Sequence, residues 1–191
     1  MDYYLFKMLS NNDNTIKRRL KIVLLGSVGT GKTIFCMKVK NNYVDKNMEY
    51  ISTTGASYFS TEIIIENLNL YLEFWDTSGQ ERFKALNKFF YKDADIICIF
   101  YNSYDISSFE RAKIMIKTCK ENTYENTLLV LIRSRYDECL QSNYDKNIIS
   151  DEEALEYADL NNLYFTHVSS FEKNEFGYKE LIKIFLKKIK I

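Results

Sequence analysis

Apolar runs alternate with amphipathic and polar segments along most of this chain. Six runs have the apolar, β-branched and aromatic character of strands, namely Arg18–Leu25, Ala56–Glu66, Leu70–Trp75, Asp95–Tyr101, Leu128–Ile132 and Leu163–Val168. Helical spacing, capping residues or end charges predict helices over Lys32–Asn41, from after Gln80 to about Tyr91, over Ile106–Cys119, from Asp151 onward and over Gly177–Ile191. This alternation predicts an α/β fold with a six-stranded, mostly parallel sheet and helices on both faces.

Two details refine this organisation. The link Glu66-Asn67 is too short for a crossover, so the strands on either side of it are predicted to be antiparallel neighbours. Residues 1–17, with the polar stretch Ser10–Asn14, are predicted to be a flexible N-terminal leader, and residues 18–191 a single domain.

Composition narrows the possible partners. The chain has 191 residues, 46% of them hydrophobic, which is enough for a sizeable core. Its 26 basic and 26 acidic side chains cancel, so the composition indicates no nucleic-acid partner. The four cysteines, Cys36, Cys98, Cys119 and Cys139, form no C-x-x-C pair, and we expect free thiols in a reducing compartment.

One motif carries chemistry. Gly26-Ser27-Val28-Gly29-Thr30-Gly31-Lys32-Thr33 has the phosphate-loop pattern G-x-x-x-x-G-K-[S/T] between a predicted strand and a predicted helix. Glycines let successive N–H groups curl around a phosphate chain, and the helix start adds its positive dipole end. Lys32 would reach the phosphates and the Thr33 hydroxyl would bind Mg²⁺. A chance match in a glycine-containing turn is the alternative.

Two later blocks remove that alternative. Ser52-Thr53-Thr54-Gly55-Ala56 resembles the first switch, and Trp75-Asp76-Thr77-Ser78-Gly79-Gln80-Glu81-Arg82-Phe83 resembles the second switch, of the Rab branch of the Ras-like small GTPases. The resemblance covers roughly Arg19 to Lys188, and the block around Tyr58, Ala85-Leu86 and Phe90-Tyr91 is most similar to early-endosomal Rab proteins. It implies the phosphate-loop NTPase fold of a small GTPase domain.

The resemblance assigns roles residue by residue. It implies Mg²⁺ as cofactor, held directly by Thr33 and Thr53 and through water by Asp76, and Gln80 as the catalytic residue that orients the attacking water. It implies effector contacts at Tyr58, Trp75 and Phe90, for which packing at a sheet edge is the alternative. The GTP or GDP site would combine five segments: Val28, Gly29, Thr30, Gly31, Lys32, Thr33 and Ile34; Thr53; Gly79; Ser134, Arg135 and Asp137; Ser170 and Phe171.

The chain departs from the family at the base. The guanine-reading N-K-x-D is Ser134-Arg135-Tyr136-Asp137, and the later S-A-K is Ser169-Ser170-Phe171. Asp137 keeps the carboxylate that accepts from guanine, and Arg135 could stack over the base. Ser134 cannot replace an asparagine amide, so we expect retained guanine preference with affinity weakened by ~1–3 kcal/mol.

Two further departures concern turnover and anchoring. Val28 occupies a loop position that is usually Gly, Ser or Ala, and its β-branched side chain would crowd Gln80 or an incoming arginine finger, so slow hydrolysis is expected. The last cysteine is Cys139, so the family's C-terminal prenylation cysteines are missing, and membrane contact is expected only through partners or an unrecognised anchor.

The combined interpretation is a monomeric, cytoplasmic Rab-like GTPase that acts as a switch in vesicle traffic at endosomal or other vesicle membranes. Effectors, exchange factors and GTPase-activating proteins are its expected partners. The alternative is a nucleotide-binding scaffold with weakened guanine specificity or little hydrolysis. Gln80 favours the enzyme, whereas Val28 and Ser134 favour the scaffold. A kinase or another ATP-using phosphate-loop enzyme fits the length and motif set less well.

Overall fold

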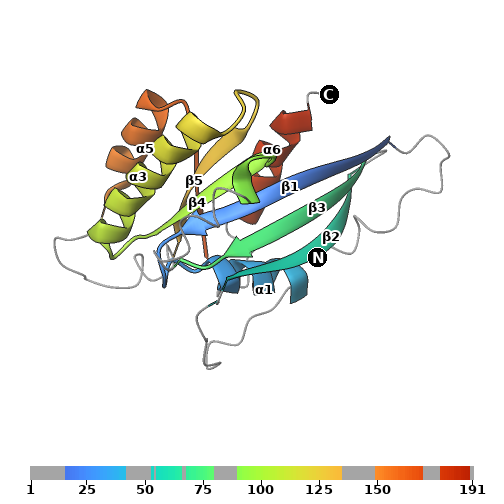
Figure 1. The fold of residues 1–191 in the computed structure, drawn as a ribbon, viewed down its shortest axis with the longest axis horizontal. Helices are drawn as coiled ribbons and strands as arrows, with labels where there is room; N and C mark the ends of the chain where they lie inside the picture. The colour runs from blue at the N-terminus through green and yellow to red at the C-terminus, as the bar shows by residue number, and fades with distance from the viewer. Residues whose placement is uncertain are drawn as a thin grey trace.

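A computed structural model describes residues 16–41, 53, 55–65, 68–79, 90–134, 149–169 and 177–189. Among the described residues strands and helices alternate as predicted (Figure 1), with strands β1 (Ile16–Gly26), β2 (Ala56–Ile65), β3 (Leu68–Thr77), β4 (Ile96–Asn102), β5 (Leu128–Ser134) and β6 (Tyr164–Val168). Most of the helix predicted from after Gln80 to about Tyr91, residues 80–89, lies outside the described residues. The helices are α1 (Lys32–Asn41), α3 (Ile106–Asn122), α5 (Asp151–Leu160) and α6 (Tyr178–Ile189). None of these described helices has the length and apolarity that crossing a bilayer requires.

The strands form one six-stranded sheet in the order β2-β3-β1-β4-β5-β6. All neighbours are parallel except β2 and β3, whose antiparallel ladder runs from Ile65 opposite Leu68 to Ala56 opposite Thr77. The predicted fold class and the predicted hairpin are therefore confirmed. The predicted turn Glu66-Asn67 lies outside the described residues.

Several strands run further than their apolar patterns indicate. β1 begins at Ile16 rather than Arg18, and β3 covers Leu68–Thr77 rather than Leu70–Trp75. The ladder explains the difference, because Ile16 pairs with Leu68 and Leu24 with Asp76, so backbone pairing continues through polar residues. Strand ends are set by hydrogen-bonding neighbours, which a hydrophobic pattern does not reveal.

The sheet separates two apolar layers. One contains Phe35 of α1 and Leu181, Ile184 and Phe185 of α6, and the other contains Phe109 and Ile116 of α3 with Ala154 and Ala158 of α5. The central strand β4 supplies both layers, since Ile96, Cys98 and Phe100 face the first and Ile97, Ile99 and Tyr101 face the second. Alternate side chains of a strand point to opposite faces, so a strand buried on both faces is apolar throughout.

Local details agree with the sequence. Ser150 caps α5, because its hydroxyl oxygen accepts a hydrogen bond from the Glu153 N–H at 3.1 Å. Cys36, Cys98 and Cys119 are free and buried, and burial raises the pKa of each thiol, which keeps them protonated. Cys139 is not among the residues the structure describes.

The topology places the phosphate loop and the second switch-like segment at the same end of the sheet, where the parallel strands have their carboxyl ends. From β1 the chain builds β2 and β3 on one side and β4, β5 and β6 on the other, so the order reverses at β1. The carboxyl ends of β3, β1, β4, β5 and β6 meet at this edge because these strands are parallel. In open α/β sheets, ligands bind outside the carboxyl ends of the strands at the point where the strand order reverses.

Candidate nucleotide and magnesium site

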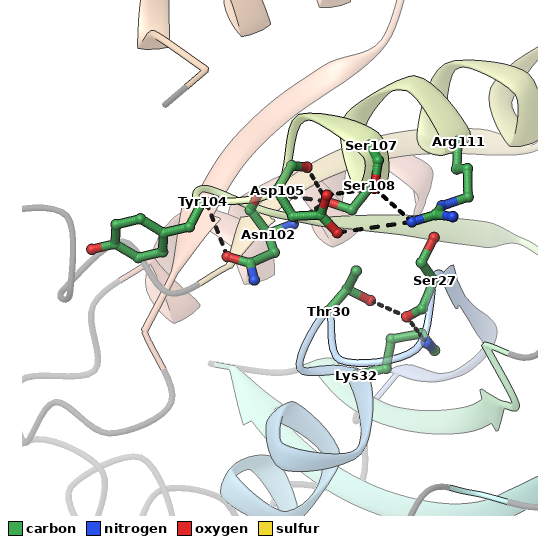
Figure 2. Close-up of polar contacts among 9 residues, drawn as sticks. All are labelled: Ser27, Thr30, Lys32, Asn102, Tyr104, Asp105, Ser107, Ser108 and Arg111. Atoms are coloured by element: carbon green, nitrogen blue, oxygen red, sulfur yellow. Dashed lines mark hydrogen bonds and ion pairs between the residues drawn. The ribbon is translucent and has the colours of Figure 1, made fainter. Parts of the chain in front are cut away.

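The phosphate loop turns sharply where β1 ends. Gly26 has φ of 143°, and a Cβ built there would lie 2.5 Å from the Phe100 carbonyl oxygen of β4, so only glycine fits. The Ser27 carbonyl oxygen then accepts from the Thr30 hydroxyl at 2.8 Å and from Lys32 Nζ at 2.9 Å (Figure 2). Thr30 is buried, whereas Val28 and Gly29 face solvent. The loop thus encloses the lysine head.

Lys32 is a buried cation. It is 5% exposed, and its Nζ donates to the Gly26 and Ser27 carbonyl oxygens at 2.8 and 2.9 Å. Burial lowers the pKa of Lys32 to about 8, while Asp76 acts in the opposite direction. An ammonium group held by carbonyl oxygens keeps its net positive charge, so an anion bound beside it would be stabilised electrostatically.

Asp76 is the matching buried acid at the end of β3. Its side chain is fully buried, and Oδ2 accepts from the Thr33 hydroxyl at 2.7 Å and from the Thr53 hydroxyl at 3.4 Å. Burial raises the pKa of Asp76, while the Thr33 hydrogen bond and Lys32 oppose that shift. Among the described residues, Asp76 Oδ1 finds no hydrogen-bond partner. A buried carboxylate oxygen in this state is a strong acceptor for a cation or its bound water.

The oxygen atoms fit the shell of a magnesium ion. The Thr33 and Thr53 hydroxyl oxygens are 2.8 Å apart, although the residues come from α1 and from the segment before β2. Neighbouring ligands in an octahedral magnesium shell are about 2.9 Å apart, and Mg²⁺ prefers oxygen ligands. The structure brings together the three residues predicted for the metal, Thr33, Thr53 and Asp76.

Gly79 lies directly against the phosphate loop. Its φ is not positive, yet a Cβ built there would lie 2.5 Å from the Ser27 carbonyl carbon and would also clash with the Val28 nitrogen. The adjacent Ser78 N–H donates to the Gly55 carbonyl oxygen at 2.6 Å. The two switch-like segments therefore meet each other and the loop. Gln80 is outside the described part of the chain.

The structure describes only part of the region after β5 and β6, where the sequence predicts the contacts to the base. Ser134 ends β5, is 4% exposed and lies beside the phosphate loop, because a Cβ built on Gly31 would be 3.7 Å from the Ser134 Cβ. Its hydroxyl donates to the Tyr101 carbonyl oxygen at 2.9 Å, so its one donor proton is directed into the protein. Ile34 lies in the first turn of α1. The remaining predicted base and loop contacts, Arg135, Asp137, Ser170 and Phe171, fall outside the described residues.

The predicted effector aromatics form one group. The rings of Tyr58 and Trp75 have centroids 5.1 Å apart, and those of Trp75 and Phe90 are 5.5 Å apart. Tyr58 is 50% exposed, and its hydroxyl donates to Glu73 Oε1 at 2.9 Å. Hydrogen bonding to Arg19 lowers the pKa of Glu73 despite its partial burial, so the acid stays ionised beside the group. The contact is compatible with both effector binding and edge packing.

Comparison with known proteins decides the family. The sequence model that describes the Ras family matches residues 21–190 of this chain. The chain belongs to the Ras family. It is 33% identical to the Ras-related protein Rab5A of Oryza sativa subsp. japonica over 164 residues, which is 85% of this chain and 76% of that protein.

Other relatives agree. The Ras-related protein RABF2a of Arabidopsis thaliana is 33% identical over 151 residues, 78% of this chain and 72% of that protein. The GTP-binding protein ypt3 of Schizosaccharomyces pombe is 30% identical over 152 residues, covering 80% and 68% respectively. The predicted relation to the early-endosomal Rab branch of the Ras family is confirmed.

Sequence reasoning missed one polar group in this Ras-family chain. Arg133 precedes Ser134, is 4% exposed and donates from Nη1 to Asp151 Oδ1 at 2.5 Å. The only sequence signal was the position of Arg133 directly after the apolar run Leu128–Ile132, and its burial at the end of β5 is seen in the structure. A charged residue buried at a strand end requires a partner, and the sequence does not show that this partner is Asp151.

The close approach of Gly79 gives the first prediction. Gly79→Ala should lower the free energy of unfolding by roughly 1–3 kcal/mol, since its Cβ must displace the loop backbone at Ser27 and Val28. Chemical denaturation measures the change, and hydrogen exchange at the loop amides should increase. Ser57→Ala, at an exposed position of β2, is the control and should change stability by less than about 0.5 kcal/mol. An unchanged Gly79→Ala variant would contradict the contact.

Proposed function

We propose that this Ras-family protein binds GDP and GTP with Mg²⁺, hydrolyses GTP slowly, and serves as a nucleotide-dependent switch in vesicle traffic. The observation that carries the proposal is the meeting of Lys32, Thr33, Thr53 and Asp76 where β1 and β3 end. A buried ammonium, and near it a buried carboxylate that accepts from two hydroxyls, suit a phosphate chain and a divalent cation at the same place.

The residues would act by position and charge. Lys32 would hold the outer phosphates, and the loop amides would donate to them around the glycine turns. Mg²⁺, when bound to Thr33 and Thr53, would supply charge neutralisation of the phosphate oxygens. Gly79 would donate its N–H to the terminal phosphate, which its close approach to the loop permits. Gln80 would orient the attacking water.

The same contacts would make a switch. Thr53 and Gly79 belong to different segments, and a terminal phosphate would hold both against the loop. Its loss would remove one contact from each and release them. Effectors that recognise one state would then read the nucleotide at the group Tyr58, Trp75 and Phe90, while exchange factors and GTPase-activating proteins would set the balance. Relatives of the Rab5 type favour the cytoplasmic face of endosomal membranes as the place of action.

A nucleotide-binding scaffold is the second candidate. Val28 is 51% exposed in the turn against which Gly79 lies, where its side chain can obstruct a catalytic water or an incoming arginine. Ser134 donates its hydroxyl proton to the Tyr101 carbonyl oxygen, so its side chain has no second proton to donate to a base. Val28 favours binding without fast turnover, Ser134 favours weakened guanine specificity, and neither removes the proposed phosphate and magnesium contacts.

Binding of labelled GDP, GTP and ATP tests the proposed ligand. Guanine nucleotides should bind at least roughly tenfold more tightly than ATP, because a carboxylate at Asp137 accepts from guanine and would face an acceptor on adenine. Equal affinity for ATP would contradict the guanine assignment. Asp137→Asn is the matched variant, and it should move the preference toward xanthine nucleotides while leaving the phosphate contacts unchanged.

Single-turnover hydrolysis of GTP tests the role of Val28. Val28→Gly should accelerate hydrolysis on the order of tenfold, since removing the side chain clears space in the turn against which Gly79 lies. Val28→Ile keeps a β-branched side chain and should remain as slow as the native protein. No acceleration in Val28→Gly would count against crowding and in favour of the scaffold.

A further inference from the structure

An arginine of α3 is held in place by the first residues of that helix. Arg111 Nη2 donates to the Ser107 hydroxyl at 2.7 Å and lies 3.9 Å from Asp105 Oδ2. The Ser107 hydroxyl in turn donates to Asp105 Oδ1 at 2.5 Å. Asp105 is the N-cap residue of α3, yet among the described residues its carboxylate accepts no capping hydrogen bond, which an aspartate at this position ordinarily does. The carboxylate orients the guanidinium instead.

The packing of α3 places this arginine beside the phosphate loop. Phe109 and Ala112 of α3 share an apolar layer with Leu25 of β1, the strand that leads into the loop. Arg111 directly precedes Ala112. Figure 2 shows the Ser27 hydroxyl pointing toward the Arg111 guanidinium. The start of α3 therefore faces the turn that follows β1.

Each side of this contact carries a hydrogen-bonding atom that is not otherwise used. Among the described residues, neither Ser27 Oγ nor Arg111 Nε has a hydrogen-bond partner, although both atoms are buried. A serine hydroxyl oxygen can accept and an arginine Nε can donate, so the two atoms are complementary. Leaving buried polar atoms without partners costs free energy, which favours an arrangement that pairs them.

The turn at Ser27 also touches the groups that would handle phosphate. The Ser27 carbonyl oxygen accepts from Lys32 Nζ at 2.9 Å, and a Cβ built on Gly79 would lie 2.5 Å from the Ser27 carbonyl carbon. Lys32 is the cation proposed to hold the phosphates, and Gly79 is the proposed donor to the terminal phosphate. A side chain that fixes Ser27 from α3 would therefore help to fix the phosphate contacts as well.

We propose that Arg111 is a positioning residue: its Nε donates to the Ser27 hydroxyl, holds this turn of the phosphate loop from α3, and thereby slows the release of bound nucleotide. The inference rests on the proposed binding of GDP and GTP. In this role Arg111 touches no nucleotide and acts through Ser27. An arginine that only supported the fold would contribute to thermal stability, and its loss would leave the rate of nucleotide release unchanged.

The rate at which bound GDP leaves in the presence of Mg²⁺ and excess unlabelled GDP tests the inference. Arg111→Met keeps an apolar stem but has no donor, and it should release GDP roughly fivefold faster, because one hydrogen bond that holds the loop is lost. Ser27→Ala removes the acceptor and should give a similar increase. Arg111→Lys keeps the positive charge without the Nε donor and should also release GDP faster than the native protein.

A double-mutant cycle separates this hydrogen bond from the other effects of each substitution. The variant that carries both Ser27→Ala and Arg111→Met should release GDP no faster than either single variant, because both changes remove the same bond. Effects that multiply in the double variant would show that the two residues act independently and would overturn the inference. A native release rate in Ser27→Ala, in Arg111→Met or in Arg111→Lys would overturn it as well.

Lys117→Met is the matched control, because it removes an exposed cation from the same helix. It should leave the release rate unchanged. An equal acceleration in Lys117→Met would show that the charge of α3, rather than the contact with Ser27, sets the rate, and would contradict the proposed role. The melting temperature of every variant is measured alongside. Should Arg111→Met not fold, Ser27→Ala and Arg111→Lys decide.

The same measurements distinguish this inference from the proposed function. A native protein that binds no GDP would overturn the proposed function. A native protein that binds GDP, with variants that release it at the native rate, would overturn only the role of Arg111.

Discussion

Two opposite charges buried at the end of the sheet are the constraint on which the site depends. Lys32 and Asp76 are removed from water by the same fold. Burial lowers the pKa of Lys32 and raises that of Asp76, and the opposite charge of each partner counteracts part of this effect. Neither is satisfied by a simple ion pair, since Lys32 donates to carbonyl oxygens and Asp76 accepts from hydroxyls. Burying such charges costs desolvation free energy unless a ligand supplies the missing interactions. They therefore indicate function rather than stability.

The topology produces this juxtaposition. β1 pairs with β3 in parallel, and Leu24 lies opposite Asp76, so the loop after β1 must turn beside the acid. The Thr77 hydroxyl reinforces the alignment by donating to the Leu24 carbonyl oxygen at 2.6 Å. Further along the carboxyl ends of the strands, hydrogen bonds hold the end of β5. Ser134 donates to the Tyr101 carbonyl oxygen of β4, and Arg133 donates to Asp151 of α5. The strand order and these hydrogen bonds thus connect the phosphate loop after β1 with the end of β5.

Much of this arrangement could be predicted from the sequence, because the strong signals are local. The phosphate-loop pattern gave helix Lys32–Asn41 with the observed bounds, and Ser150 with three acids gave the capped start of α5. The ends of β1 and β3 could not be predicted, since they depend on partners across the ladder. The pairing of Arg133 with Asp151 was missed for the same reason: the partners are distant in sequence and meet only when β5 and α5 pack.

The release of bound GDP with and without a metal chelator tests the central claim most directly. If Thr33, Thr53 and Asp76 hold Mg²⁺ against a phosphate chain beside Lys32, chelation should accelerate release from the native protein by roughly tenfold or more. In Thr33→Ala, which lacks the hydroxyl bonded to Asp76 and Thr53, the rates with and without chelator should converge. Release from the native protein that is indifferent to chelation would contradict the account.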